Sequence, residues 1–215
     1  FDGHAYINAA LEGGAAGCFT QRERESYLPG KFYIKVDSTQ RALRDLAKYY
    51  KKKFPIPVVA LTGSVGKTTT KDMVAAVLGE KYRVLKTEGN LNNEIGVPMT
   101  LLRLSGEHEI AVLELGMNHA GEIDYLSALV EPDVVLMTNI GDSHIEHFGS
   151  REKILEAKSE IFHHVKSGAF VVINGDDPLL NTLPGKLPYA FTRVGAGEGL
   201  DYRAEGLVSD GKSHM

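Results

Sequence analysis

A strand that runs into a glycine turn, a lysine and three threonines constrains this chain more than any other feature. Residues 58–73 read VVALTGSVGKTTTKDM, where an apolar run meets Gly63 and Gly66 before a helical pattern begins near Lys67. Such a turn directs backbone N–H groups and the positive end of a helix dipole at one point, which suits a phosphate. Lys67 adds a positive charge, and Thr68 adds the hydroxyl that ligates magnesium in such loops. The usual loop has four residues between its glycines, whereas this one has two.

Apolar runs alternate with helical patterns through the rest of the chain. Strands are predicted at residues 58–63, 82–87, 110–116, 133–140 and 169–175, and helices near residues 67–78, 98–104, 121–130 and 151–165. Continuous apolar runs indicate strands that are covered on both faces, hence a parallel sheet with crossover helices. The sequence therefore predicts an α/β fold: a P-loop-type central domain with a mostly parallel sheet flanked by helices.

The beginning of the chain has a different pattern. DGHAYINAALEGGAAGCF and KFYIKV suggest a helix and short strands of a small α/β domain, of which residues 1–36 are a part. Residues 37–57 are predicted to form a connecting helix and linker, with Asp37 or Ser38 as N-cap and prolines 55 and 57 after its end. The central domain then covers residues 58–215. Because the chain opens on Phe1 and residues 206–215 suggest an unfinished strand and turn, we expect a fragment of a longer protein.

Composition excludes several classes of partner. The 28 acidic residues slightly outnumber the 24 basic ones, so no broad basic face indicates a nucleic-acid partner. The single cysteine, Cys18, excludes a disulfide framework and fits a reducing compartment. No apolar run approaches the roughly 20 residues of a membrane span. We therefore expect a cytoplasmic protein.

Polar residues follow the predicted strands where ligands bind in open parallel sheets, outside the carboxyl ends of the strands. Glu114 closes the apolar strand IAVLE, where a carboxylate beside a phosphate loop can hold magnesium directly or through water. His144 follows another strand end by a few residues and is a candidate metal ligand or phosphate contact. The alternatives are an ordinary solvated acid and an ordinary loop histidine.

Lys158 occupies an unexpected position in a helical pattern. It lies four residues after Ile154 and four before Phe162, inside an apolar stripe. A lysine there is costly unless its ammonium reaches solvent or is paired. Periodicity alone leaves both possibilities open.

Five segments together resemble the Mur ligases. They are TGSVGKTTT, TEGNLNNEIGVPMTLL, ELGMNHAGEI, TNIGDSHIEHFGS and AKSEIF. DGHAYINAALEGGA is similar to the latter part of the family's N-terminal uridine-nucleotide domain. The short loop is shared by all Mur-type ligases and by folylpolyglutamate synthases. Residues 90–98 and GMNHAGEI resemble the branch that joins UDP-N-acetylmuramoyl-tripeptide to D-alanyl-D-alanine in peptidoglycan synthesis.

The resemblance implies a role for each matching residue. Residues implied to bind the ATP phosphates are Ser64, Val65, Gly66, Lys67, Thr68 and Thr69. Thr68 and Glu114 would hold one magnesium ion, and His144 and Lys158 a second, with Lys158 carbamylated. Lys67, His144 and Lys158 would be catalytic. Residues implied to line the muramoyl-peptide and γ-phosphate side are Asn90, Asn92, Asn93 and His119. Asn174 and residues 191–204 match the region near the adenine.

The implied reaction is an ATP-dependent amide ligation. A peptide carboxylate attacks the γ-phosphate to give an acyl phosphate, and an amine then displaces phosphate. Two like unit charges 4 Å apart repel by about 4 kcal/mol at an effective dielectric of 20, so metals and Lys67 must neutralise the approach. We find no match to the family's C-terminal domain and expect the fragment, a monomer, to be inactive alone. The alternatives are another Mur-type or folylpolyglutamate-type ligase, or a non-catalytic nucleotide-binding module.

Overall fold

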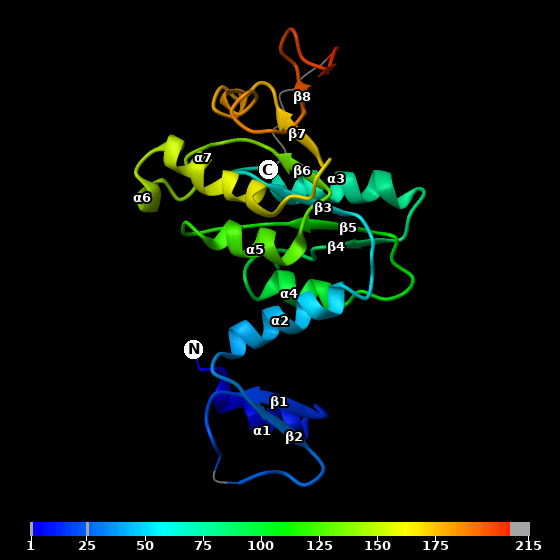
Figure 1. Ribbon diagram of the computed structural model, residues 1–215, viewed down its shortest axis with the longest axis vertical. Coiled ribbons are helices and arrows are strands. Elements are labelled where there is room, and N and C mark those ends of the chain that lie inside the picture. Colours follow the sequence, from blue (N-terminus) through cyan, green and yellow to red (C-terminus); the bar gives the residue numbers. More distant parts are fainter. Residues whose placement is uncertain (1, 25, 207–215) are drawn as a thin grey trace.

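The computed structural model describes residues 2–24 and 26–206 and contains two separate sheets (Figure 1). The expected strand and turn at residues 207–215 lie outside the described part. The small sheet pairs β1 (Gly17–Thr20) with β2 (Phe32–Lys35) in parallel. Beside it are η1 (Gly3–Tyr6) and α1 (Ile7–Glu12), and the long helix α2 (Thr39–Lys51) lies between this unit and the larger sheet.

The larger sheet has seven strands in the order β4-β5-β3-β6-β7-β8-β9, and every neighbouring pair is parallel. Its strands are β3 (Val58–Thr62), β4 (Val84–Lys86), β5 (Ile110–Glu114), β6 (Val134–Met137), β7 (Phe170–Asn174), β8 (Phe191–Gly195) and β9 (Tyr202–Arg203). Its helices are α3 (Lys67–Gly79), α4 (Gly96–Leu101), α5 (Glu122–Val130), α6 (Ile145–Phe148), α7 (Arg151–Ser159), η2 (Glu160–His164) and η3 (Leu180–Thr182). The predicted α/β architecture is confirmed.

Apolar cores lie on both faces of this sheet, and they differ in size. Val58 and Ala60 of β3 belong to the larger core, which α2, α4, α5, α7 and η2 cover. Val59 and Leu61 belong to the smaller core, where they pack with Ala75 of α3. Alternate residues of one strand point to opposite faces, so β3 is buried on both.

Strand order explains why one face carries a single helix. The connection from β3 to β4 runs toward one edge, whereas those from β4 to β5, β5 to β6, β6 to β7 and β7 to β8 run the other way. Right-handed crossovers in opposite directions place their helices on opposite faces. Among the described residues, α3 therefore covers β3 and β5 but leaves parts of β6 and β7 uncovered. Phe170 of β7 is accordingly 70% exposed.

Several predicted boundaries shift. Helix α4 begins at Gly96 rather than near Pro98, because a proline is tolerated in the first turn of a helix. The predicted helix at 151–165 is α-helical only to Ser159 and continues as the 3₁₀ helix η2. Ser38, not Asp37, caps α2, since its hydroxyl accepts a hydrogen bond from the N–H of Arg41. Helix α6 and strands β8 and β9 have no counterpart among the predicted elements.

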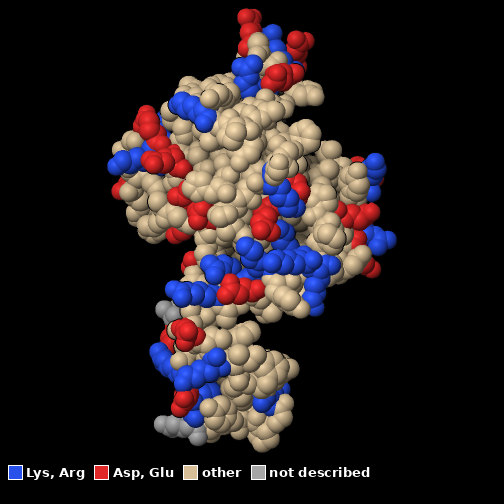
Figure 2. Space-filling model, viewed as in Figure 1, with Lys and Arg blue, Asp and Glu red and all other residues tan. Residues whose placement is uncertain are grey.

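Basic side chains gather in a band across the middle of the molecule, over α2 (Figure 2). Two lysines of α2 have structural partners: the ammonium of Lys48 donates to the carbonyl of Ala128, and that of Lys51 to the carbonyl of Val130. Both carbonyls belong to the last turn of α5, where cations stabilise the negative end of the helix dipole. No helix within residues 2–24 and 26–206 has the length and apolarity needed to cross a bilayer.

Candidate active site

The turn between β3 and α3 is held against the loop that follows β6. The N–H of Ser64 donates to the carbonyl of Asn139, and the N–H of Val65 donates to its side-chain oxygen, both at 2.9 Å. A Cβ at Gly63 would lie 1.9 Å from the hydroxyl oxygen of Thr138, so only glycine fits there. Gly66 has a φ of 78°, a left-handed conformation that glycine adopts freely.

These bonds change which donors face a phosphate. The N–H groups of Ser64 and Val65, both expected to bind phosphate, already donate to Asn139. The first turn of α3 starts at Lys67, and no side chain caps it. Because the first N–H groups of a helix have no partner within the helix, those of Lys67, Thr68 and Thr69 form the better phosphate site.

Lys67 bends back over this turn. Its Nζ donates to the carbonyl oxygens of Gly63 at 2.9 Å and Ser64 at 3.4 Å. Burial lowers the pKa of Lys67, and the negative charge of Glu114 partly opposes the shift. The Lys67 ammonium is thus held by two carbonyl oxygens, and an incoming phosphate can replace them as its hydrogen-bond partner.

Glu114 ends β5 as a buried carboxylate, 1% exposed. The hydroxyl of Thr68 donates to Oε2 at 2.9 Å, and the side-chain amide of Asn92 donates to Oε1 at 2.8 Å. The N–H of Glu114 donates to the hydroxyl of Thr87 at 3.0 Å. Two residues predicted from separate motifs, Thr68 and Glu114, therefore meet directly.

Lys158 is buried, with 2% of its surface exposed. Burial, reinforced by the positive charge of Lys67, lowers the pKa of Lys158 to about 7. Within residues 2–24 and 26–206, no hydrogen bond or ion pair to the Lys158 ammonium is present. The charged form of this lysine therefore lacks a counter-ion from the described fold.

His144 and the asparagine-rich segment meet in one hollow of about 190 Å³. His144 precedes α6 with a φ of 67°, which is rare for a non-glycine residue and is concentrated at functional sites. The residues that line the hollow come from three loops and the starts of α3 and α5: Lys67, Asn90, Asn92, Asn93, Gly116, Met117, Asn118, Glu122 and His144. Five of these nine were site candidates from the sequence.

Asn93, which lines the hollow, and two candidates outside its lining, His119 and Asn174, have other side-chain partners. His119 is exposed, with Nδ1 3.1 Å from Oε1 of Glu122 and its ring centre 5.3 Å from that of His147. The side-chain oxygen of Asn93 accepts from the N–H of Gly96 at 2.9 Å, at the start of α4. Asn174 accepts from the N–H of Asp176, shapes the turn after β7 and does not line this hollow.

Sequence reasoning did not single out two residues that organise the site. Asn139 holds the phosphate turn, and its signal was its place directly after the strand that ends at Met137. Glu160 accepts hydrogen bonds from the N–H groups of Gly121 and Asp124, and so caps α5 behind the hollow. Its only signal was its place in the AKSEIF segment.

The donor set fits magnesium. Thr68 and Glu114 offer hard oxygen ligands, and magnesium in such sites is bound by one or two carboxylates together with phosphates and water. Among the described residues no group of three His, Cys, Asp or Glu side chains could hold a metal alone. His144 and an unmodified Lys158 offer only nitrogen, which magnesium disfavours.

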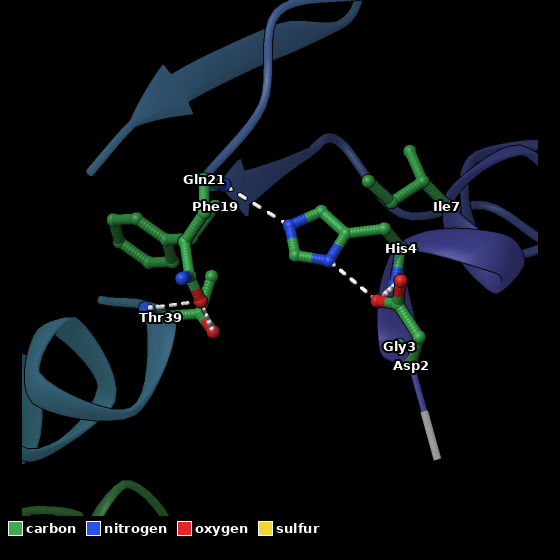
Figure 3. Close-up of a pocket in the computed structure, with 7 residues that line it drawn as sticks. All are labelled: Asp2, Gly3, His4, Ile7, Phe19, Gln21 and Thr39. Carbon is green, nitrogen blue, oxygen red and sulfur yellow. Dashed lines mark hydrogen bonds and ion pairs between the residues drawn. The ribbon is translucent and has the colours of Figure 1, made fainter. Parts of the chain in front are cut away.

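A second hollow, of about 360 Å³, lies between the small sheet and the start of α2 (Figure 3). His4 Nδ1 is 2.7 Å from the carboxylate of Asp2, and His4 Nε2 accepts from the N–H of Gln21 at 3.0 Å. The Gln21 side-chain oxygen accepts from the N–H and hydroxyl of Thr39. The acceptor role of Nε2 places the ring proton on Nδ1, toward Asp2.

Comparison with known proteins shows which family this arrangement represents. Residues 61–213 match the family model described as the Mur ligase middle domain. The chain belongs to the Mur ligase family. It is 49% identical over 180 residues to UDP-N-acetylmuramoyl-tripeptide--D-alanyl-D-alanine ligase of Bacillus subtilis, covering 84% of this chain and 39% of that protein.

Solved structures agree with this family. MurF ligase from Thermotoga maritima in complex with ADP superposes with a TM-score of 0.83 at 37% identity, covering 94% of this chain and 46% of that one. Folylpolyglutamate synthase from Mycobacterium tuberculosis shares the fold, with a TM-score of 0.57, at 17% identity over 72% of this chain and 46% of that one. This Mur ligase chain thus spans less than half the length of these relatives.

Proposed function

We propose that the protein containing this Mur ligase chain is an ATP-dependent amide ligase that adds D-alanyl-D-alanine to UDP-N-acetylmuramoyl-tripeptide. The observation that carries the proposal is the hollow where Lys67, the asparagine-rich segment and His144 meet, directly beside the Thr68–Glu114 pair. An acidic peptide and a triphosphate can meet there only if their charges are neutralised. Lys67 and the N-terminus of α3 supply positive potential on the nucleotide side.

Two covalent steps follow. A carboxylate oxygen of the tripeptide attacks the γ-phosphorus and the bond to the β-phosphate oxygen breaks, which releases ADP. The amine of D-alanyl-D-alanine then attacks the acyl carbon, phosphate leaves and the nitrogen loses a proton. Lys67 withdraws charge from the phosphates, while Glu114 and Thr68 would hold a magnesium ion, which lowers the repulsion between the two anions when bound.

Lys158 would enter this chemistry as a carbamate. A neutral lysine amine adds to carbon dioxide, forming an N–C bond and releasing a proton. The pKa of Lys158, about 7, leaves a large fraction of the amine neutral near pH 7. The product is an anion with two hard oxygens, which suits a second magnesium ion together with His144. It also removes the uncompensated positive charge beside Lys67.

The small α/β unit at residues 2–36 would be part of the site for the uridine nucleotide, and Asn174 and residues 191–204 would lie near the adenine. With ATP and a uridine-nucleotide substrate, we place the reaction in the cytoplasm, in an enzyme that acts as a monomer. Residues 1–215 alone would bind nucleotide weakly and complete no amide bond, because domain closure completes sites of this kind.

The test is a substrate-dependence assay on the intact protein. ADP release should require both UDP-N-acetylmuramoyl-tripeptide and D-alanyl-D-alanine, and mass spectrometry should find the amide product. Turnover with a folate and glutamate instead would assign the protein to the folylpolyglutamate-type ligases. Nucleotide binding without turnover on either substrate pair would contradict a catalytic role.

A further inference from the structure

Asn92 touches both the asparagine-rich segment and the end of β5. Its side-chain amide donates to Oε1 of Glu114 at 2.8 Å, while Thr68 donates to Oε2 at 2.9 Å. One donor on each oxygen fixes the plane of the carboxylate as well as its position. Glu114 is 1% exposed, so solvent contributes little to that orientation.

Asn92 is itself held in place by backbone contacts. Its N–H donates to the carbonyl of Asn90 at 2.7 Å, and its carbonyl accepts from the N–H of Gly116 at 2.8 Å. The second bond is made by Gly116, which lies two residues after Glu114, the last residue of β5. The peptide group of Asn92 is therefore attached to the same strand whose last carboxylate its side chain orients.

Gly116 provides the space that this arrangement needs. A Cβ at position 116 would lie 2.7 Å from the side-chain oxygen of Asn92 and 2.8 Å from its Cγ. Cβ contacts under 3.0 Å are essentially never seen in proteins, so any side chain at 116 would displace the Asn92 amide from Glu114. Glycine is required here by the close approach rather than by backbone conformation.

The chemistry of the pair favours an orienting role. Both hydrogen-bond donors to the carboxylate are neutral, so they do not compensate the negative charge of Glu114. That charge acts on Lys67, whose pKa it raises against the effect of burial. Partners that orient metal-binding carboxylates change metal affinity or activity by about 10- to 100-fold when they are removed. Glu114 takes one of the two N–H donors of the Asn92 side-chain amide.

We propose that Asn92 is a positioning residue for the metal-binding carboxylate of Glu114, with Gly116 as its spacer, rather than a contact to the muramoyl peptide. The inference rests on the proposed magnesium–nucleotide role of Thr68 and Glu114. All three asparagines of the segment line the hollow, but Asn92 orients the metal-binding carboxylate, whereas the side-chain oxygen of Asn93 accepts from the N–H of Gly96 at the start of α4.

The test measures metal binding apart from turnover, in the intact protein. Mn²⁺ is titrated into the ADP complex and followed by electron paramagnetic resonance. Asn92→Ala should weaken Mn²⁺ binding by about 10- to 100-fold, and Gly116→Ala should shift it in the same direction with Asn92 present. Binding of ADP without metal, and KM for UDP-N-acetylmuramoyl-tripeptide at saturating Mg²⁺, should stay within twofold of wild type.

Asn93→Ala is the matched control. It removes a neighbouring side chain and the cap of α4 but leaves the Glu114 carboxylate untouched, so Mn²⁺ affinity should not change. Equal loss of Mn²⁺ affinity in Asn93→Ala would overturn the proposal, since general damage to the segment would then explain the effect. Unchanged Mn²⁺ affinity in Asn92→Ala with a raised KM for the muramoyl substrate would also overturn it. If the intact protein catalyses no ligation but Asn92→Ala still weakens Mn²⁺ binding, the proposed function fails and this inference stands.

Discussion

Two of the three lysines that are buried in the described part of the chain, Lys51 and Lys158, have opposite surroundings. Lys51 of α2 donates to the carbonyl of Val130, and its Nζ is 3.5 Å from Oε2 of Glu131. Lys158 of α7 has no such acceptor within residues 2–24 and 26–206, and the nearby charge that acts on it is the positive one of Lys67. Burial lowers the pKa of both, but Glu131 opposes the shift at Lys51 whereas Lys67 reinforces it at Lys158.

The difference separates a lysine whose charge the fold balances from one whose charge it does not. The fold supplies an anion and a carbonyl where α2 meets α5, so the cost of burying Lys51 is offset locally. Beside Lys158, by contrast, the nearby charged group is a second cation, Lys67. A buried cation next to another cation is stabilised either by an anion from outside the described fold or by loss of its proton.

The largest expected effect is on catalysis. If the proposed function is right, Lys158→Met in the intact protein should lower ligase turnover by at least about a hundredfold, because the proposed carbamate ligand of the metal site is lost. Lys51→Met is the matched control and should keep turnover within a few-fold at temperatures where it is folded. Steady-state ADP release measures both. Partial rescue of Lys158→Ala by a short carboxylic acid would support the carbamate, and equal turnover in wild type and Lys158→Met would remove Lys158 from the mechanism.

The turn after β3 and the loop after β6 should hold each other rigidly before any ligand binds. Gly63→Ala places a methyl group where the Thr138 hydroxyl lies, so we expect a loss of about 3 kcal/mol in the free energy of unfolding. Gly79→Ala meets no atom within 4 Å at the end of α3 and should be neutral or slightly stabilising. Urea unfolding of both variants makes the comparison. A Gly63→Ala protein as stable as wild type would mean that the turn and the loop after β6 move independently.

Replacing the two lysines should change stability in opposite directions at pH 6. Lys51→Met leaves the Val130 carbonyl without its donor and should cost about 2 kcal/mol. Lys158→Met removes an unbalanced buried charge and should stabilise the fold in the absence of ligand. Thermal unfolding at pH 6 measures both signs. Destabilisation of similar size in both variants would show that Lys158 is balanced after all.

The stability gain of Lys158→Met should also depend on pH. Between the folded-state pKa of about 7 and the unfolded value of 10.5, the unfolded chain holds a proton on Lys158 that the folded chain lacks. Wild-type stability should therefore rise with pH in this window, relative to Lys158→Met, by at most about 1.4 kcal/mol per pH unit. Denaturant titrations in carbon-dioxide-free buffer measure the difference. A flat difference from pH 7 to 10 would contradict the lowered pKa.

Sequence patterns predicted the parts of the molecule that physical periodicity fixes. The strands that became β3, β5, β6 and β7 are apolar runs, and parallel strands bring their carboxyl ends to one rim, so Glu114 was expected beside Thr68. Strands β8 and β9 were not predicted because they contain polar residues and glycine rather than a continuous apolar run, and because they are the last two strands at one edge of the sheet.

The remaining features depend on loop paths, which have no periodic signature. Nothing in the spacing of Asn92 indicates that its amide reaches Glu114, or that Asn139 occupies the N–H groups of the phosphate turn. Periodicity placed Lys158 in an apolar stripe, but whether its ammonium reached solvent depended on the packing of α7 against its neighbours. Tertiary contacts decided each of these cases.

The central claim is that the loops at this rim form one site for nucleotide phosphates and metal. Anomalous diffraction from the intact protein, crystallised with Mn²⁺ and a non-hydrolysable ATP analogue, tests it most directly. The account predicts phosphates over Lys67 and the first turn of α3, a manganese peak about 2.2 Å from the Thr68 hydroxyl, with Glu114 holding it directly or through water, and extra density on the Nζ of Lys158. A nucleotide bound elsewhere, or manganese away from Thr68 and Glu114, would contradict it.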